Sequence, residues 1–394
     1  MRVDILCPDL ASNCLGRAHV LGRLLQGAWD VRIVGPCTAP QAWEPLRSDR
    51  GIPLVPIPMP ATAAEARPGD GRRVWAEVEG SLDAEVVYVS KPFHASLAAA
   101  RSQARRTGAA LLLDIDDTET GILWESLRHM PARDRLRFLG RHQRWHHREP
   151  WNVLLGAAEA GRVPHRSVSN RFLQRRHGGV LLPHARDPGE LDPARHTRAR
   201  SRADLGLPAE APLVLFLGTP RPTKGLETLL AAMSHVPREA MLAIVGLDAT
   251  PYSRKLASAA AAALGTRAVL RPPVPFSQVP DWLAAADVVA IPQESNRSSR
   301  GQMPAKVFDA MSMARPIVAT QVSDLPEVLE GCARLVPPGD PSGLGAALRD
   351  LLSSPGLAAE LGKRARARLV ERYSLQAVAP QARQLVQDAL AARE

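Results

Sequence analysis

Short runs of apolar, often β-branched residues recur along the first half of the chain, at intervals that leave room for a helix. These runs begin at Val3, Val31, Pro53, Glu85 and Ala110. Apolar positions at helical spacing fill two of the gaps, at residues 18–26 and 96–107. Strands that alternate with helices in this way predict parallel βαβ units.

The same alternation returns more regularly in the second half. Apolar runs begin there at Leu213, Met241, Ala268, Asp287, Pro316 and Ala333, with helical patterns at 225–234, 252–264 and 304–313. Residues 187–212 are rich in Pro, Arg and Ala, which predicts a linker, and residues 356–392 are expected to form two further helices. We therefore expect an α/β chain of two doubly wound, Rossmann-like domains facing each other across a cleft, with ligands at the carboxyl ends of both sheets.

The length and composition agree with this expectation. A chain of 394 residues exceeds what one hydrophobic core usually holds, and 45% hydrophobic with 23% charged residues is typical of soluble globular proteins. The four cysteines stand far apart without a CxxC pair, so neither disulfides nor a zinc site is expected. No signal-peptide pattern and no run long enough for a membrane span is found, and we expect a cytoplasmic protein.

The net charge of +10 comes almost entirely from arginine, since only five of the fifty basic residues are lysine. One interpretation is the codon bias of a GC-rich bacterial genome; the other is attraction to anionic substrates or to an anionic membrane surface. Nucleic acid is not expected as a partner, because aromatic residues are only 4% of the chain. Residues 128–148 hold seven arginines and one acid, which indicates either a solvated helix surface or a weak peripheral membrane contact.

The segment LFLGTPRPTKGLETLL, residues 215–230, is the most informative. A strand ends at Gly218, a loop with Arg221 and Lys224 follows, and Gly225 begins an amphipathic helix. Two cations beside the free N–H groups of a helix start predict a diphosphate site. The segment lacks Gly-Lys-Ser/Thr and is not a Walker A loop. The alternative is a solvated loop.

A second segment, residues 295–320, runs from a polar loop into a helix with Pro304 near its start. Lys306 and Asp309 stand three residues apart and so lie on neighbouring positions of one helix face. Asp309 could accept hydrogen bonds from ribose hydroxyls. The alternative is an ordinary surface Lys–Asp pair.

In this order, the two segments resemble the retaining GT-B glycosyltransferases of family 4, strongly over residues 213–339 and more weakly in the first half. The resemblance implies that Arg221 and Lys224 hold the diphosphate of a nucleotide-sugar donor. It also implies that Asp309, in "FDAM", takes the place of the glutamate that binds the donor ribose in the family's "EAM" helix. The segment SDLPEVL at Ser323 matches the family as well.

The chain departs from the family at one position. The family often shows two glutamates, and the first of them falls on Gly301, whereas Lys306 matches a known sub-pattern with "PxK" before the helix. The donor-binding residues implied by the resemblance are Gly16, Gly218, Pro273, Val274, Gly301, Gln302, Met303, Pro304, Lys306 and Asp309.

In the first half, the segment LLLDIDDTET, residues 111–120, ends a strand in a row of acids. A metal-dependent phosphatase is disfavoured because this is the fifth strand-like run and no second acidic cluster follows. A metal-using Asp-x-Asp sugar transferase is disfavoured because such chains lack a second nucleotide domain. By the resemblance, Asp116 stands where many family members carry a histidine, and we expect it to meet hydroxyls of the donor sugar or acceptor without a metal. The alternative is that these acids cap the next helix and pair with local arginines.

Candidate acceptor contacts follow other strands of the first half. They are Asn13 in the loop that ends at Gly16, Lys91 and His94 in VYVSKPFHAS, and Asp117. A lone histidine near a helix start is more often structural, which is the alternative for His94.

We therefore expect residues 1–186 to form the N-terminal acceptor-side domain and residues 187–372 the donor-binding domain, with a final helix at 373–394 packing back on the N-terminal domain. The expected activity is transfer of a hexosyl-type group from a UDP-, GDP- or ADP-sugar to an unidentified saccharide, lipid-linked or small-metabolite acceptor. Arg221, Lys224 and Asp116 are the expected catalytic residues. The reaction is expected to retain the anomeric configuration and to need neither a metal nor another cofactor. A monomer or homodimer is expected. The alternatives are a catalytically degenerate nucleotide-sugar binder and a phosphorylase or epimerase on the same fold.

Overall fold

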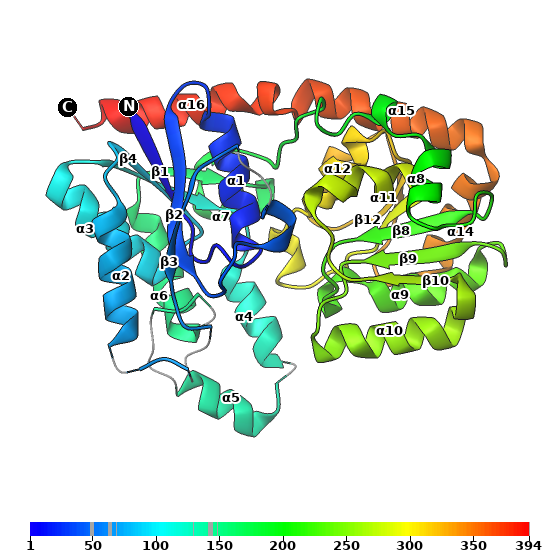
Figure 1. The fold of residues 1–394 in the computed structure, drawn as a ribbon, viewed down its shortest axis with the longest axis horizontal. Coiled ribbons are helices and arrows are strands. Elements are labelled where there is room, and N and C mark those ends of the chain that lie inside the picture. The colour runs from blue at the N-terminus through cyan, green and yellow to red at the C-terminus, as the bar shows by residue number, and fades with distance from the viewer. Residues whose placement is uncertain are drawn as a thin grey trace. The chain divides into compact units, whose positions relative to one another are not determined.

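The computed structural model describes residues 1–47, 51–61, 65–67, 69–128, 130–140, 145–147 and 149–393. The chain divides into two compact units, the first made of residues 1–184 with 378–394 and the second of residues 185–377 (Figure 1). These units divide the chain at 184/185 and 377/378, whereas the domains expected from the sequence divide it at 186/187 and 372/373. Each unit is described by itself below.

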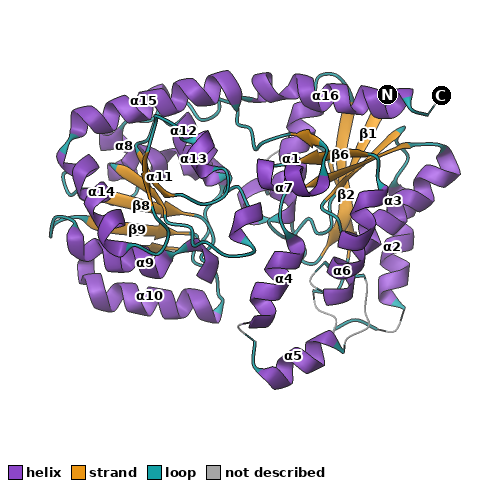
Figure 2. Ribbon diagram, turned by 180° about the vertical axis from the view of Figure 1, so that it is seen from behind, coloured by secondary structure: helices purple, strands orange, loops and turns teal. Residues whose placement is uncertain are grey.

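The first unit is built on a parallel sheet with the strand order β3-β2-β1-β4-β5-β6-β7. Its strands are β1 (Arg2–Leu6), β2 (Asp30–Cys37), β3 (Leu54–Pro58), β4 (Val86–Ser90), β5 (Ala110–Ile115), β6 (His165–Val168) and β7 (Val180–Leu181). Its helices are α1 (Cys14–Leu25), α2 (Asp70–Ser81), α3 (His94–Thr107), α4 (Glu119–Arg128), α5 (Ala132–Leu139), α6 (Pro150–Glu159) and α7 (Arg171–His177). Helices lie on both faces of this sheet, which is the doubly wound arrangement (Figure 2).

The second unit repeats the plan with a parallel sheet in the order β10-β9-β8-β11-β12-β13. Its strands are β8 (Leu213–Leu217), β9 (Met241–Val245), β10 (Ala268–Arg271), β11 (Val288–Ile291), β12 (Ile317–Thr320) and β13 (Arg334–Val336). Its helices are α8 (Arg198–Asp204), α9 (Leu226–Ala232), α10 (Pro251–Leu264), α11 (Val279–Ala285), α12 (Lys306–Ser312), α13 (Leu325–Val328), α14 (Pro341–Ser353) and α15 (Pro355–Arg372). The apolar runs identified in the sequence all become strands of these two sheets, so the prediction of alternating parallel βαβ units is confirmed.

The strand β8 shows why such runs are apolar at every position. Successive side chains of a strand point to opposite faces of the sheet. Leu213, Leu215 and Leu217 pack into the hydrophobic core on one face, and Val214 and Phe216 pack into the core on the other face. Helices cover both faces, so a strand without a polar position is the expected consequence.

The prediction that residues 187–212 form a linker is wrong. This segment contains α8, which packs against α11, and the side chain of Arg202 is only 1% exposed. Its guanidinium forms an ion pair with Asp287 at 2.7 Å and donates to the main-chain carbonyls of residues 208, 209, 211 and 285. The arginine that made the segment look like a solvated linker is therefore a buried part of the second unit.

The last helix, α16 (Leu375–Ala391), contributes residues from 378 onward to the first unit. Arg383 donates to the carbonyls of Leu24 at 3.3 Å and Gln26 at 3.2 Å, and Arg393 donates to the carbonyl of Glu85 at 3.0 Å. The C-terminal residues are thus held beside α1 and the start of β4.

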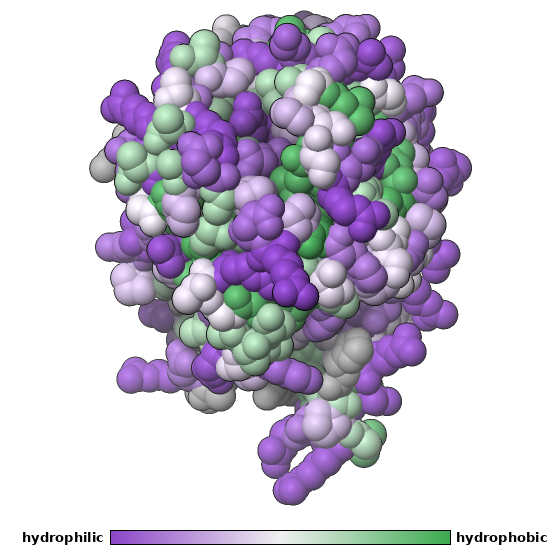
Figure 3. Space-filling model, turned by 90° about the vertical axis from the view of Figure 1, so that its right-hand side faces the viewer, coloured by the Kyte–Doolittle hydropathy of each residue, from purple (hydrophilic) through white to green (hydrophobic). Residues whose placement is uncertain are grey.

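No helix within the described residues is long and apolar enough to cross a membrane. On the face shown in Figure 3, hydrophilic side chains predominate and apolar ones form small separate areas. The short helix α5 has no buried residue, which fits the interpretation of its arginines as a solvated surface. Residues 129, 141–144 and 148 of the arginine-rich segment lie outside the described part of the chain.

Candidate functional site

The strand order of the second sheet reverses between β8 and β11, and ligands of doubly wound sheets bind at the carboxyl ends of the strands at such a point. The predicted basic loop begins there, directly after β8. Gly225 in this loop has φ 66°, and a Cβ on it would lie 1.7 Å from the carbonyl oxygen of Pro292, which follows β11. Only glycine permits this approach, so the basic loop is seated against the end of the neighbouring strand.

Arg221 is oriented by an acid from the next strand–helix connection. Its Nη1 donates to Asp248 Oδ2 at 2.8 Å and to the carbonyl of Pro220 at 2.7 Å, while about half of the side chain (48%) stays exposed. Burial opposes ionisation of Asp248, but hydrogen bonds from Ser253, Thr250 and Arg221 outweigh it and lower the pKa to about 2. The guanidinium is therefore fixed at the loop and remains accessible to an anion.

Two lysines accompany Arg221. In the loop itself, Lys224 Nζ donates to Gln302 Oε1, and Nζ of the half-buried Lys306 lies 3.4 Å from the centroid of the Phe216 ring. A Cβ on Gly218 would lie 3.4 Å from Lys306 Nζ, so glycine leaves room for this ammonium group. Burial, with a smaller contribution from the charge of Lys224, lowers the pKa of Lys306 well below its ordinary value. An anion at this position would relieve the repulsion between the two lysines.

The helix α12 carries Asp309 in its first turn. Asp309 is buried and pairs with Arg186, and Lys306 is half-buried, so the alternative of an ordinary surface Lys–Asp pair is wrong. Asp309 instead accepts a hydrogen bond at Oδ1 from Nε of Arg186, a residue that the sequence interpretation did not single out.

The remaining predicted donor residues lie on the same sheet edge. Gly301 ends a short 3-10 turn and is buried, as are Met303 and Pro304. Pro273 and Val274 follow β10, and Pro273 is exposed. The second unit thus gathers its predicted residues around the carboxyl ends of β8, β10 and β11.

In the first unit, the row of acids after β5 surrounds one lysine. Lys91 Nζ donates to Asp116 Oδ1 at 2.6 Å, to Asp117 Oδ2 at 2.8 Å and to Glu119 Oε1 at 2.7 Å. The strands β4 and β5 pair with Ser90 opposite Asp114, so the residues that follow both strands meet at one edge. Three predicted ligand contacts therefore form a single buried ion cluster.

This cluster is electrostatically unusual. Burial raises the pKa of Asp116 to about 7 against the opposing charge of Lys91, and burial raises the pKa of Glu119 as well. The pKa of Lys91 is well above its ordinary value because the three carboxylates outweigh its burial. The three carboxylates offer ligand atoms within 4.8 Å of one another, a grouping that suits a divalent cation, and the Lys91 ammonium supplies a positive charge there.

The backbone at Lys91 is also strained. Its φ of 78° lies in the left-handed region, which non-glycine residues adopt at a cost and which is often found at functional sites. The surrounding ion pairs hold it in this conformation.

Other predicted acceptor contacts have different surroundings. His94 Nδ1 lies 2.9 Å from Glu159 Oε1, and the other oxygen of Glu159 accepts from Arg101 at 2.8 Å, which favours a structural role for the histidine. Asn13 is exposed at the start of α1 and forms no side-chain cap there. Gly16, the predicted donor-binding residue near the start of α1, lies against Trp43, because a Cβ added to it would be 3.3 Å from the Trp43 ring.

Sequence interpretation missed a second buried pair beside the acid cluster. Arg17 Nε and Nη2 donate to Asp114 Oδ2 and Oδ1 at 2.9 and 2.8 Å, and Nη2 also donates to the carbonyl of Leu182 at 2.8 Å. Asp114 accepts from the Ser167 hydroxyl, which is 2.6 Å from the Tyr88 hydroxyl. Two features of the sequence could have indicated this pair. Arg17 directly follows the loop that ends at Gly16, and Asp114 and Ser167 are polar positions within the strands β5 and β6.

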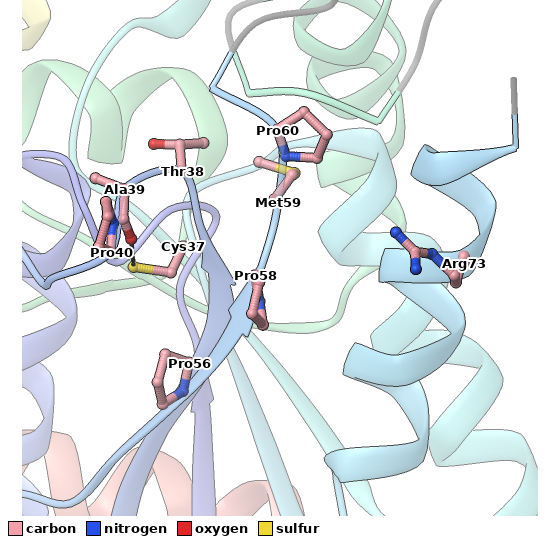
Figure 4. Close-up of a pocket in the computed structure, with 9 residues that line it drawn as sticks. All are labelled: Cys37, Thr38, Ala39, Pro40, Pro56, Pro58, Met59, Pro60 and Arg73. Atoms are coloured by element: carbon pink, nitrogen blue, oxygen red, sulfur yellow. Dashed lines mark hydrogen bonds between the residues drawn. The ribbon is translucent and has the colours of Figure 1, made fainter. Parts of the chain in front are cut away.

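A pocket of about 460 Å³ lies at the carboxyl ends of β2 and β3. Figure 4 shows four prolines, Met59 and Cys37 around it, with Arg73 set apart on α2. The Cys37 thiol is already hydrogen-bonded to the carbonyl of Ala39 at 3.1 Å. None of the residues predicted from the sequence lines this pocket, and its apolar wall is unsuited to a diphosphate.

Residues 211–354, which contain the basic loop and α12, match the family described as glycosyl transferases group 1. The chain is 34% identical over 194 residues to D-inositol 3-phosphate glycosyltransferase of Xylanimonas cellulosilytica, covering 48% of this chain and 45% of the relative. It is 32% identical over 249 residues to the protein of the same name from Kineococcus radiotolerans, covering 55% and 56%. The chain spans about half the length of the curated relatives it matches.

Two solved structures are similar over nearly the whole chain. Sucrose-phosphate synthase of Thermosynechococcus elongatus has a TM-score of 0.74 at 18% identity and covers 100% of both chains. HepE of Anabaena, in complex with UDP and glucose, has a TM-score of 0.75 at 17% identity and covers 98% of this chain and 100% of its own. The fold is therefore α/β with two Rossmann-like domains of the GT-B type, and residues 211–354 carry the pattern of glycosyl transferases group 1.

Proposed function

We propose that this protein transfers a sugar from a nucleoside-diphosphate sugar to an acceptor. The observation that carries the proposal is the basic loop at the switch point of the second sheet, inside the segment that matches glycosyl transferases group 1. Arg221 is fixed by Asp248 with about half of its side chain accessible, Lys224 belongs to the same loop, and the half-buried Lys306 reaches the strand end at Gly218. These cations would neutralise the diphosphate as it departs, which can lower the barrier by several kcal/mol.

The proposal includes retention of the anomeric configuration and no catalytic metal, as in the family 4 enzymes that the sequence resembles. Asp116 is proposed to contact hydroxyls of the donor sugar or the acceptor. A carboxyl group with a pKa of about 7, held by Lys91, can accept or return a proton near neutral pH. The relatives are named for D-inositol 3-phosphate, and HepE was solved with UDP and glucose, so an inositol phosphate acceptor and a UDP-sugar donor should be tested first.

The test is turnover of UDP-, GDP- and ADP-sugars by the full chain with a panel of sugar, inositol phosphate and lipid-linked acceptors. Released nucleoside diphosphate is measured with and without EDTA, and NMR of the product gives the anomeric configuration. Acceptor-dependent release that survives EDTA and retains configuration is the expected result. Turnover that requires phosphate, or that occurs without an acceptor, would instead indicate a phosphorylase or an epimerase.

A second candidate function is nucleotide-sugar binding without catalysis. It is favoured by Gly301, which stands where the resembled family often has its first glutamate, and by the engagement of Asp309 with Arg186. Donor binding without turnover across the whole acceptor panel would support this candidate.

A further inference from the structure

Arginine–aspartate pairs in this protein differ in how much of their hydrogen-bonding capacity they use. Arg17 with Asp114 forms two bonds, at 2.9 and 2.8 Å, and Arg32 with Asp4 also forms two, at 2.6 and 2.9 Å. In both pairs Nε and Nη2 meet the two carboxylate oxygens, which is the planar fork geometry of these groups. In each of these pairs, both carboxylate oxygens accept a hydrogen bond from the guanidinium.

The pair between Arg186 and Asp309 is incomplete. Nε of Arg186 donates to Oδ1 of Asp309. Among the residues that the structure describes, Nη2 of Arg186 and Oδ2 of Asp309 form no hydrogen bond. A guanidinium can only donate and a carboxylate can only accept, so Nη2 keeps its N–H donors open and Oδ2 keeps its acceptor sites open.

Both side chains are held in place. They are only 14% and 10% exposed, and Nη1 of Arg186 donates to the carbonyl of Ala185 at 2.9 Å. The guanidinium carbon lies 5.9 Å from the centroid of the Phe276 ring, which is close in sequence to the predicted donor-binding residues Pro273 and Val274. The main-chain N–H of Arg186 donates to the carbonyl of Tyr373 at 3.0 Å. Little conformational entropy would therefore be lost when a ligand binds here.

We propose that Arg186 is a donor-binding residue and that it acts with Asp309 on one vicinal diol, the ribose of the nucleotide. A hydroxyl of the diol donates to Oδ2 of Asp309, and a hydroxyl oxygen accepts from Nη2 of Arg186. A diol supplies both functions, whereas a phosphate offers only acceptors at neutral pH. This proposal rests on the proposed function, since it assumes that the donor is a ribonucleotide.

The chemistry predicts strong discrimination against a deoxyribose. A ligand that lacks one hydroxyl leaves a largely buried charged group without its partner, and sites built to bind a hydroxyl reject such analogues strongly. Affinity for the 2′-deoxy diphosphate should therefore be at least about tenfold weaker than for the ribonucleotide.

The experiment is calorimetric titration of the full chain with UDP, GDP and ADP and with their 2′-deoxy counterparts. Wild type should prefer at least one ribonucleotide by at least about tenfold. Arg186→Met should reduce this preference to within about threefold, chiefly by weakening the ribonucleotide, and Asp309→Asn should also reduce it. A merely structural arginine would weaken both forms equally, so the ratio of the two affinities is the decisive reading.

Arg334→Met is the matched control, since Arg334 forms an exposed ion pair with Asp350 at 2.7 Å elsewhere in the second unit, and its preference should equal that of wild type. If a ribonucleotide binds but wild type does not prefer it to its 2′-deoxy counterpart, or if Arg186→Met keeps the wild-type preference, the role of Arg186 is overturned while the proposed function stands. If none of the three diphosphates binds wild type, both are overturned. Should Arg186→Met fail to fold, Arg186→Gln takes its place, because the amide keeps a hydrogen-bond donor for Asp309 without the guanidinium fork, and an unchanged preference in that variant likewise overturns the role of Arg186.

Discussion

The Lys91 cluster offers a sharp stability test, because one ammonium group serves three carboxylates. Replacing Lys91 by Met keeps a long unbranched side chain and removes the charge. Asp116, Asp117 and Glu119 would then keep their burial and lose the cation that each contacts at 2.6 to 2.8 Å.

Removing one partner of a buried ion pair typically costs about 3–5 kcal/mol, because the other charge is left uncompensated. Against a total stability of about 5–15 kcal/mol, the loss is a large fraction of what holds the unit folded. The left-handed backbone at residue 91 remains strained in the methionine variant. Lys91→Gly should therefore be more stable than Lys91→Met by about 1 kcal/mol, since glycine adopts this φ without strain.

The loss should depend on pH. Without the ammonium, burial raises the pKa values of Asp116 and Glu119 further above those in the unfolded chain. The folded state then binds more protons than the unfolded state, so the free energy of unfolding rises as the pH falls. Wild type should have the same sign of pH dependence through Asp116, between its folded pKa of about 7 and the ordinary value of 3.8, and the variant should have it more strongly.

The assay is native-state hydrogen exchange of the β4 and β5 amides at pH 8 and pH 5, which reports the stability of the first unit alone. Lys255→Met, on the exposed face of α10, is the matched control and should leave exchange unchanged. A Lys91→Met variant within about 1 kcal/mol of wild type at pH 8, or one whose loss is equal at both pH values, would refute the reasoning.

Two further changes probe the second unit. Arg202→Met should lower the free energy of unfolding by at least about 3 kcal/mol in a urea titration, because four carbonyls and Asp287 lose their common donor; a loss below about 1 kcal/mol would contradict the buried role. Gly225→Ala should weaken nucleoside-diphosphate binding and lower the melting temperature, because its Cβ would lie 1.7 Å from the Pro292 carbonyl oxygen. Thermal scans with and without UDP, GDP and ADP measure both effects, and an alanine variant identical to wild type would show that the loop is not seated against β11.

The fold followed closely from the hydrophobic pattern, because strands buried on both faces leave apolar runs that few other structures produce. The segment 187–212 was misjudged for the converse reason. Its arginines look solvated in a sequence, and only the tertiary structure brings four carbonyls around Arg202.

The candidate site was predictable in part. The sequence identifies Lys91 and Asp116 each as a polar residue after a buried strand, but it does not predict their ion pair with each other. Lys91 follows β4 and Asp116 follows β5, and the pairing of these two strands brings the side chains together. The sequence alone does not say which strands are neighbours in the sheet. Arg186 carried no local signal, because its partner Asp309 is 123 residues away in the sequence.

The central claim is that the loop after β8 binds the donor diphosphate. The most direct test is the affinity of the full chain for UDP, GDP and ADP, measured by calorimetry in wild type, Arg221→Ala and Lys224→Ala, with Lys255→Ala as the surface control. Both loop variants should bind the preferred diphosphate at least about tenfold more weakly, a loss of about 1.4 kcal/mol or more, while the control equals wild type. Wild-type affinity in both loop variants would contradict the claim.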